Sequence, residues 1–335
     1  MISYLFRRWE QQLASVDTNR VVRPFEWGLD WLGIGVNGSD PATAVRGWVD
    51  KTMANTAAFY DAPAINDYHL QDDTLRFPSA VTTPHEINNT VNVRVFPAEA
   101  RPGQPRRAAI VLPQWNSDPE GHVGLCRLFA RFGITALRLS LPYHDARKPA
   151  DLERAEYIVS PNIGRTLQVN RQAVLDAKRT IDWATREGYR VGIVGTSLGS
   201  CLSMLTMAHD PRVQVGAFNH VSPYFADVVW RGLSTRHVRE GLETDVTLET
   251  LREFWMPISP WPFIDRVRGR RILLVYATYD QTFPLDLSRR FINEFHARNV
   301  PHETAVLPCG HYTTGKAPFK FLDGYYLTKF LVRAL

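Results

Sequence analysis

The chain has 335 residues, of which 44% are hydrophobic and 22% charged, and its formal net charge is +5. At this length about 75% of the unfolded surface can be buried, so a core forms without disulfide or metal support. The basic residues lie in short, scattered clusters, which argues against a nucleic-acid groove, because such a groove needs a concentrated basic face. Since no run of 18 apolar residues occurs, the sequence predicts no transmembrane segment.

The three cysteines, Cys126, Cys201 and Cys309, are odd in number and show no C-x-x-C spacing. We therefore expect reduced, buried thiols and a cytoplasmic protein. The first nine residues lack the apolar segment and cleavage site of a secretory signal. The missing signal also leads us to expect a cytoplasmic protein.

Residues 1–73 are predicted to form an N-terminal helical extension without a catalytic motif. Within residues 1–15, apolar side chains recur at helical spacing on one face; these are Ile2, Leu5, Phe6, Trp9 and Leu13. We expect this face to pack on the protein's own body, and contact with a membrane surface is the alternative.

A second helix is predicted to begin at Pro41 and to end near Ala57. Asp40 is a good N-cap, and Pro41 suits the first helical position. Trp27, Trp31 and Trp48 are expected to anchor the extension on the main domain.

From Thr74 onward, strands and helices alternate. The predicted strands are 75–81, 91–96, 108–112, 134–141, 191–195, 213–221, 271–276 and 303–307. The predicted helices are 122–132, 164–187, 198–208, 285–298 and 318–335. The continuous apolar run over 108–112 is typical of a parallel strand covered on both faces. The alternation predicts an α/β domain over 74–335, built on a doubly wound, mostly parallel sheet.

Residues 222–268 interrupt the alternation with a block rich in aromatic side chains. These are Tyr224, Phe225, Trp230, Phe254, Trp255, Trp261 and Phe263. One interpretation is a helical lid over an apolar pocket, with Tyr224 and Trp230 as pocket residues. The other is a set of ordinary helices that bury aromatic rings.

The strongest functional signal is Gly195-Thr196-Ser197-Leu198-Gly199, between a buried strand and an apolar helix. Strand, G-x-S-x-G turn and helix is the context of a nucleophile elbow. Glycines two residues before and after Ser197 are needed because the turn brings these positions close together. A plain turn with a helix-capping serine is the alternative.

A serine nucleophile needs a base, and the base needs an orienting carboxylate. Reactive groups of open α/β sheets gather at the carboxyl ends of the strands. Asp280 follows the predicted strand 271–276, and His311 follows the strand 303–307. The order Ser, Asp, His therefore predicts a catalytic triad.

These motifs resemble the α/β-hydrolase superfamily, in particular serine esterases and dienelactone hydrolases, over residues 74–335. The resemblance implies that Ser197 is the nucleophile, His311 the general base and Asp280 its orienter. It also implies an oxyanion hole formed by the N–H of Leu198 and by a second N–H from the loop after strand 108–112. Trp115 is the expected second donor, and Gln114 is the alternative.

The remaining histidines allow functional and structural interpretations. His144 follows a strand end and is a candidate pocket residue, although structural use is the competing interpretation; His122 is similar. We expect His220 to be a satisfied core residue. No pair of histidines has metal-ligand spacing, so neither a metal nor a cofactor is predicted.

The resulting hypothesis is a serine carboxylesterase that acts on a small-molecule ester through an acyl-enzyme intermediate. An amide or peptide hydrolase with the same triad is one alternative. A catalytically silent binding protein of the same fold is another.

Overall fold

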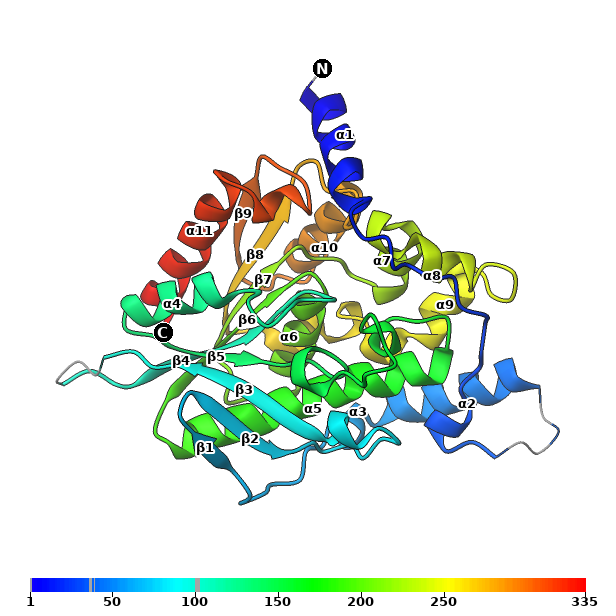
Figure 1. Ribbon diagram of the computed structural model, residues 1–335, viewed down its shortest axis with the longest axis horizontal. Coiled ribbons are helices and arrows are strands. Elements are labelled where there is room, and N and C mark those ends of the chain that lie inside the picture. The colour runs from blue at the N-terminus through cyan, green and yellow to red at the C-terminus, as the bar shows by residue number, and fades with distance from the viewer. Residues whose placement is uncertain (1, 36–37, 39, 100–102) are drawn as a thin grey trace.

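The computed structural model describes residues 2–35, 38, 40–99 and 103–335, which contain a nine-stranded sheet with helices on both faces (Figure 1). The strand order is β1-β2-β3-β5-β4-β6-β7-β8-β9. The strands are β1 (His69–Gln71), β2 (Thr74–Pro78), β3 (Thr90–Phe96), β4 (Arg107–Leu112), β5 (Thr135–Leu139), β6 (Arg190–Thr196), β7 (Val215–Asn219), β8 (Arg271–Ala277) and β9 (Glu303–Leu307). Six neighbouring strands pair in parallel, in the order β5, β4, β6, β7, β8 and β9. The strands β1, β2 and β3 form an antiparallel edge next to β5. The predicted doubly wound, mostly parallel sheet is confirmed.

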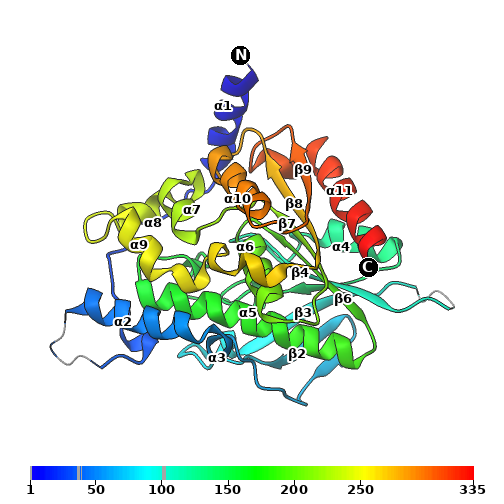
Figure 2. The same cartoon turned by 180° about the vertical axis from the view of Figure 1, so that it is seen from behind.

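Two layers of helices cover the sheet. Helices α4 (Val123–Arg131) and α11 (Phe319–Ala334) pack on one face. Helices α5 (Ile163–Arg186), α6 (Leu198–His209) and α10 (Leu285–Ala297) pack on the other face, which Figure 2 shows from the front. Because the central strands are covered on both sides, all five residues of β7 are buried.

Most strands and helices lie within a few residues of their predicted bounds, and the differences have local causes. β2 ends at Pro78 rather than at residue 81, because proline has no N–H to continue the ladder. β7 ends at Asn219, because His220 turns into the left-handed region with φ of 59°. β1 was not predicted, since all three of its residues are exposed and show no alternation. The sheet therefore begins within the predicted extension.

The insertion between β7 and β8 is helical. It contains α7 (Phe225–Arg231), α8 (Arg236–Glu240) and α9 (Leu248–Phe254), with short 3₁₀ turns between and after them. Its buried rings include Phe254, Trp255 and Phe263, which join the core on the α5 and α6 side of the sheet.

The N-terminal extension consists of α1 (Ile2–Ala14), α2 (Pro41–Ala54) and α3 (Thr56–Phe59); Met1 lies outside the described residues. The predicted N-cap is confirmed, because the Asp40 carboxylate accepts a hydrogen bond from the Thr43 N–H at 2.9 Å. The predicted tryptophan anchors are also confirmed. All three are partly buried against the main core; they are Trp27, Trp31 and Trp48.

Only part of the predicted apolar face of helix α1 packs on the body of the protein. Ile2, Leu5 and Trp9 are exposed, and the helix projects from the body of the molecule (Figure 1). Phe6, which belongs to the same predicted face, does contact the body, since its ring stacks on the Tyr279 ring with centroids 4.5 Å apart. Within the described part of the chain, no helix is both long and apolar enough to cross a bilayer.

A buried ion pair holds the segment that follows β5. Arg147 and Asp176, both fully buried, lie with Nη2 and Oδ2 2.9 Å apart. The Arg147 guanidinium also donates to the backbone oxygens of Asn88 and Ser140 at 2.7–3.1 Å. This segment supports the loop after β4, because His144 Nε2 accepts a hydrogen bond from the Asn116 N–H at 3.0 Å.

Replacement of Arg147 by alanine should lower the free energy of unfolding by about 3–5 kcal/mol, because Asp176 is left as an unpaired buried charge. Urea unfolding followed by circular dichroism measures this change. Arg231→Ala is the control, since the pair of Arg231 with Asp286 is solvent-exposed and should contribute less than about 1 kcal/mol. Equal losses for the two variants would contradict the prediction.

Candidate active site

Ser197 lies in the tight turn between β6 and α6. Its backbone has φ of 58° and ψ of −119°, a strained conformation of the kind found at functional sites. A Cβ at Gly195 would collide with the Gly199 carbonyl oxygen, and a Cβ at Gly199 with that of Leu112. The close approach predicted from the two glycines is therefore confirmed.

Asp280 follows β8, and its carboxylate accepts four hydrogen bonds. Its Oδ1 accepts hydrogen bonds from the Thr282 and Phe283 N–H groups, both at 2.7 Å. Its Oδ2 accepts from His311 Nδ1 at 3.0 Å and from His220 Nδ1 at 2.7 Å. Burial opposes ionisation, but the His311 charge and the two imidazole hydrogen bonds outweigh it and lower the pKa of Asp280.

His311 follows β9 and faces the same carboxylate, so the structure brings the predicted acid and base together. Burial alone would lower the pKa of His311, but the negative charge of Asp280 raises it above the ordinary value. The imidazole stacks on the Phe283 ring at 5.4 Å between centroids. Ser197 and His311 line one cavity. No direct hydrogen bond joins them among the described residues, and such bonds often tighten only when substrate is bound.

His220 is the residue of the site that the sequence interpretation assigned to the core. It is buried and hydrogen-bonded as expected, but its partner is Asp280. The available signal was its position, because it directly follows β7 at the edge where Asp280 and His311 also lie. A search for a single catalytic histidine after a later strand finds His311 and therefore misses His220.

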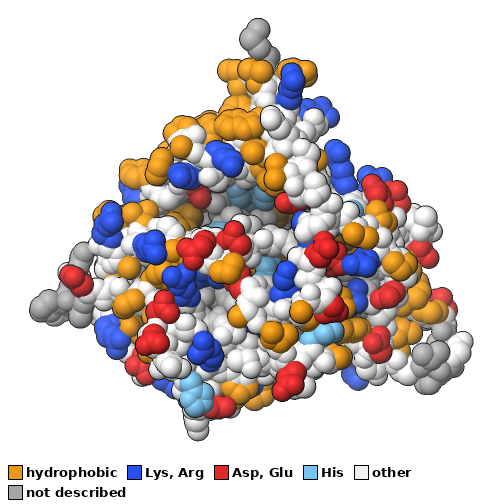
Figure 3. Space-filling view, in the orientation of Figure 1, with side chains coloured by type: hydrophobic (Ala, Val, Ile, Leu, Met, Phe, Trp, Pro, Cys, Tyr) orange, Lys and Arg blue, Asp and Glu red, His pale blue; other side chains and the backbone are white. Residues whose placement is uncertain are grey.

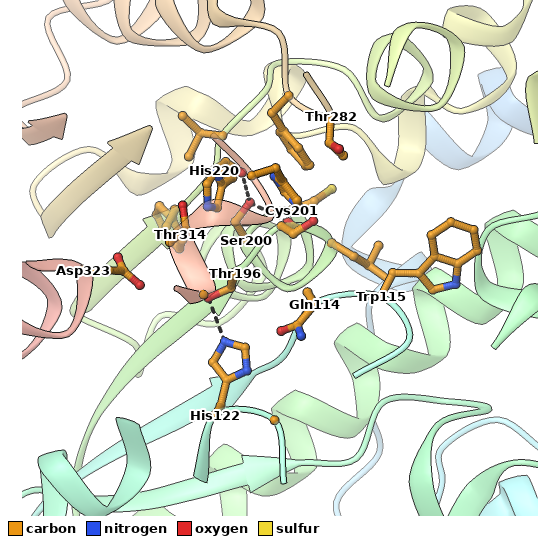
Figure 4. Close-up of a pocket in the computed structure, with 18 of the residues that line it drawn as sticks. Gln114, Trp115, His122, Thr196, Ser200, Cys201, His220, Thr282, Thr314 and Asp323 are labelled. Carbon is orange, nitrogen blue, oxygen red and sulfur yellow. Dashed lines mark hydrogen bonds between the residues drawn. The ribbon is translucent and has the colours of Figure 1, made fainter. Parts of the chain in front are cut away.

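The cavity has a volume of about 1370 Å³ and opens near the centre of the face in Figure 3, with histidine side chains at its floor. Figure 4 shows His220, Thr282 and Thr314 on one side, and Gln114 and Trp115 on another. Fully buried apolar side chains line part of it, among them Met204, Phe218 and Phe291.

Both candidate oxyanion donors from the loop after β4 are positioned on the cavity. Gln114, Trp115 and Leu198 line it. Their backbone N–H groups have no partner among the hydrogen bonds of the described residues, so all three can donate to a ligand. The Trp115 side chain is held in place, because its Nε1 donates to the Ala155 oxygen at 2.8 Å.

The three candidate pocket residues have different outcomes. Tyr224 is among the residues that line the cavity, whereas His144 and Trp230 are not. Both ring nitrogens of His144 are occupied, one by the Asn116 N–H at 3.0 Å and one by the Pro142 oxygen at 2.9 Å. His144 therefore supports the loop after β4 from behind, which corrects its assignment to the pocket.

Asp323 adds a carboxyl group to the cavity on the α11 side (Figure 4). Burial raises the pKa of Asp323 to about 7, and the opposing effect is its hydrogen bond from Asn219 Nδ2 at 3.0 Å. The group therefore titrates near neutrality.

A metal ion could in principle be held by His220, Asp280 and His311, whose ligand atoms all lie within 4.8 Å of one another. The separations of 2.7 and 3.0 Å between the imidazole nitrogens and Oδ2 are those of hydrogen bonds. Ligand atoms about 2.0–2.1 Å from a tetrahedral zinc would lie further apart. The geometry fits a hydrogen-bonded network better than a metal centre.

The cysteines are free and buried, as expected. Burial raises the pKa of Cys126 to about 12 and also raises the pKa of Cys201, which lines the cavity. These thiols are poor nucleophiles near neutral pH.

Helix α1 holds the loop that carries His311. The fully buried Glu10 carboxylate accepts hydrogen bonds from the Tyr312 and Thr313 N–H groups at 2.9 and 2.8 Å. On the other loop of the site, Gln281 Nε2 donates to the Arg7 oxygen at 2.9 Å. One helix of the extension therefore contacts both the Asp280 loop and the His311 loop.

No protein-family model matches the sequence, and no curated protein matches it. Solved structures do match. The acylaminoacyl peptidase of Pyrococcus horikoshii aligns with a TM-score of 0.62 and 15% identity over 81% of this chain and 42% of that one. The chain thus spans less than half of that peptidase.

Two further structures cover more of their own length. Pyrococcus furiosus esterase Pf2001 aligns with a TM-score of 0.55 and 14% identity over 82% of this chain and 97% of that one. The 2,6-dihydroxy-pseudo-oxynicotine hydrolase aligns with a TM-score of 0.54 and 15% identity over 88% of this chain and 79% of that one. With this sheet topology, the matches show that the chain has the α/β-hydrolase fold.

Replacement of Glu10 by alanine should free the Tyr312 and Thr313 amides. Two charge-assisted hydrogen bonds are lost, so the free energy of opening this loop should fall by about 2–3 kcal/mol. Amide hydrogen exchange resolved at these two residues measures the change. Gln11→Ala, at an exposed position on the same helix, is the control; unchanged protection in Glu10→Ala would show that the contact does not hold the loop.

Proposed function

We propose that this chain is a serine hydrolase that cleaves carboxylic esters with Ser197, His311 and Asp280. The observation that carries the proposal is the hydrogen bond to buried, ionised Asp280 from His311, which lines the same cavity as Ser197. The fold of the esterase and hydrolase neighbours supports it.

In this mechanism, Ser197 Oγ attacks the ester carbonyl carbon while its proton passes to His311 Nε2. Asp280 keeps the other ring nitrogen protonated and stabilises the imidazolium that forms. The negative oxygen of the tetrahedral intermediate accepts hydrogen bonds from the Leu198 N–H and from Trp115 or Gln114. His311 then protonates the leaving alcohol, and water repeats the sequence on the acyl-enzyme.

The lining of the cavity favours a substrate with a sizeable apolar group. Met204, Phe218 and Phe291 offer buried apolar surface within reach of the same cavity as Ser197. Burial of such a group is favourable by about 0.8 kcal/mol per CH₂.

Amide hydrolysis is the second candidate, because one structural neighbour is named an acylaminoacyl peptidase. The same three residues could catalyse either reaction. The apolar lining favours the ester, since a peptide carries backbone polar groups that need hydrogen-bond partners in a pocket.

Replacement of Ser197 by alanine should lower kcat on a p-nitrophenyl ester by about 10³-fold or more, because the acyl-enzyme can no longer form. Labelling of the wild type by a fluorophosphonate probe, located by peptide mass spectrometry, should fall on Ser197. Ser15→Ala is the control, since Ser15 is an exposed serine at the end of α1 whose Oγ donates to the Gln12 oxygen. Full activity of Ser197→Ala, or a wild type that the probe does not label, would exclude the proposal.

A paired assay separates the two reactions. The wild type should hydrolyse p-nitrophenyl esters, with kcat/KM rising from acetate to longer acyl chains, and should leave aminoacyl p-nitroanilides at the background rate. The chain-length trend follows from the apolar lining of the cavity. A higher kcat/KM on the anilides would instead assign a peptidase.

A further inference from the structure

Two imidazoles, rather than one, donate to the same oxygen of Asp280. His220 Nδ1 lies 2.7 Å from Oδ2, closer than His311 Nδ1 at 3.0 Å, and the two ring centroids are 4.4 Å apart. The other oxygen, Oδ1, is already bound by the Thr282 and Phe283 N–H groups. The mechanism proposed above uses one imidazole and leaves His220 without a role.

The backbone of His220 connects the two neighbouring parts of the site. Its N–H donates to the Val275 oxygen in β8 at 2.9 Å, and its carbonyl accepts from Ser200 Oγ in α6 at 2.7 Å. The preceding residue, Asn219, accepts from the Ser197 N–H at 2.8 Å. His220 thus lies between the strand that carries Asp280 and the turn that carries Ser197.

The conformation of His220 is unusual for a residue that only fills space. Its φ of 59° lies in the left-handed region, which only a few per cent of non-glycine residues adopt. That conformation directs the strand out of the sheet and places the imidazole on Asp280. His220 also borders the cavity, although its side chain is buried.

The charge state of His220 follows from the groups around it. Burial, and then the nearby charge of His311, lower the pKa of His220, which favours the neutral ring. Because the Asp280 carboxylate can only accept, the Nδ1 that lies 2.7 Å from Oδ2 carries the proton. The titratable groups that face His311 are Asp280, His220, Tyr312 and, from α1, Glu10. Of these, only Asp280 and His220 form a hydrogen-bonded chain with it.

We propose that His220 is a positioning residue of this site: as a neutral donor it fixes Asp280 Oδ2 between two imidazoles and shares the charge of that oxygen with His311. This inference rests on the proposed function. No proton leaves His220 during turnover. Its hydrogen bond weakens the pull of Asp280 on the His311 proton, so His311 is neutral, and able to act as a base, over a wider range of pH.

Four variants and a pH profile test the role. His220→Asn retains an N–H donor near the position of Nδ1 and suits the left-handed backbone, whereas His220→Gly suits the backbone and removes the donor. His220→Met removes the donor but fills the volume, and exposed His69→Asn is the control. For each, kcat and kcat/KM on a p-nitrophenyl ester are measured against pH.

The glycine and methionine variants should lose about 10–100-fold in kcat, with a smaller change in KM. The acid limb of their pH profiles, which is the fall of kcat/KM at low pH, should move to higher pH by about half a unit to one unit. The reason is that Asp280 then holds the His311 proton more strongly and raises the pKa of His311. His220→Asn and the control should keep the wild-type limb. Imidazole added to His220→Gly should restore both kcat and the limb.

An unchanged acid limb in a folded donor-free variant, or an asparagine variant as impaired as the glycine variant, would overturn the inference. So would fluorophosphonate labelling of Ser197 that survives His311→Asn but not His220→Gly, since His220 would then be the base.

Proton NMR of the resting protein gives a readout that does not depend on turnover. The wild type should show two low-field imidazole N–H resonances, from His220 and His311, and His220→Asn should show one. A single resonance in the wild type would overturn the inference even if the esterase is active. Two resonances in a protein without esterase activity would instead refute the proposed function alone.

Discussion

The site depends on one buried carboxylate. Asp280 can remain ionised away from water only because four donors surround it, two backbone N–H groups from its own turn and two imidazoles from the ends of other strands. Satisfying this one charge fixes the relative positions of His220 and His311. The sheet supplies the rest, because β6, β7, β8 and β9 are neighbours in parallel and bring their carboxyl ends to one edge.

The parts of the chain outside the sheet stabilise this edge from two sides. Glu10 caps the backbone next to His311, and the loop after β4 is supported from behind by His144. The insertion between β7 and β8 adds buried apolar surface to the cavity. The extension and the insertion, which carry no catalytic motif, therefore shape the geometry and the size of the site.

Much of this could be predicted from sequence, where the signal is local. The apolar run of β4, the glycines around Ser197 and the capping by Asp40 each act within a few residues. The contacts of His220, Glu10 and His144 depend instead on partners tens to hundreds of residues away. No periodicity reports such contacts. For the same reason the sequence does not show that Phe6 docks while Ile2 and Leu5 stay exposed, since helical spacing shows that a face is apolar but not how much of it is covered.

The central claim is that Ser197, His311 and the N–H groups of Leu198 and of the loop after β4 converge on one reacting carbonyl. A crystal structure of the fluorophosphonate adduct tests it most directly. The account predicts phosphorus bonded to Ser197 Oγ, with the phosphoryl oxygen about 3 Å from the Leu198 N–H and from that of Trp115 or Gln114. It also predicts that His311 Nε2 lies on the side of the phosphorus opposite to the phosphoryl oxygen and these N–H groups. An adduct whose phosphoryl oxygen contacts none of these N–H groups, or a His311 turned away from Ser197, would contradict the account.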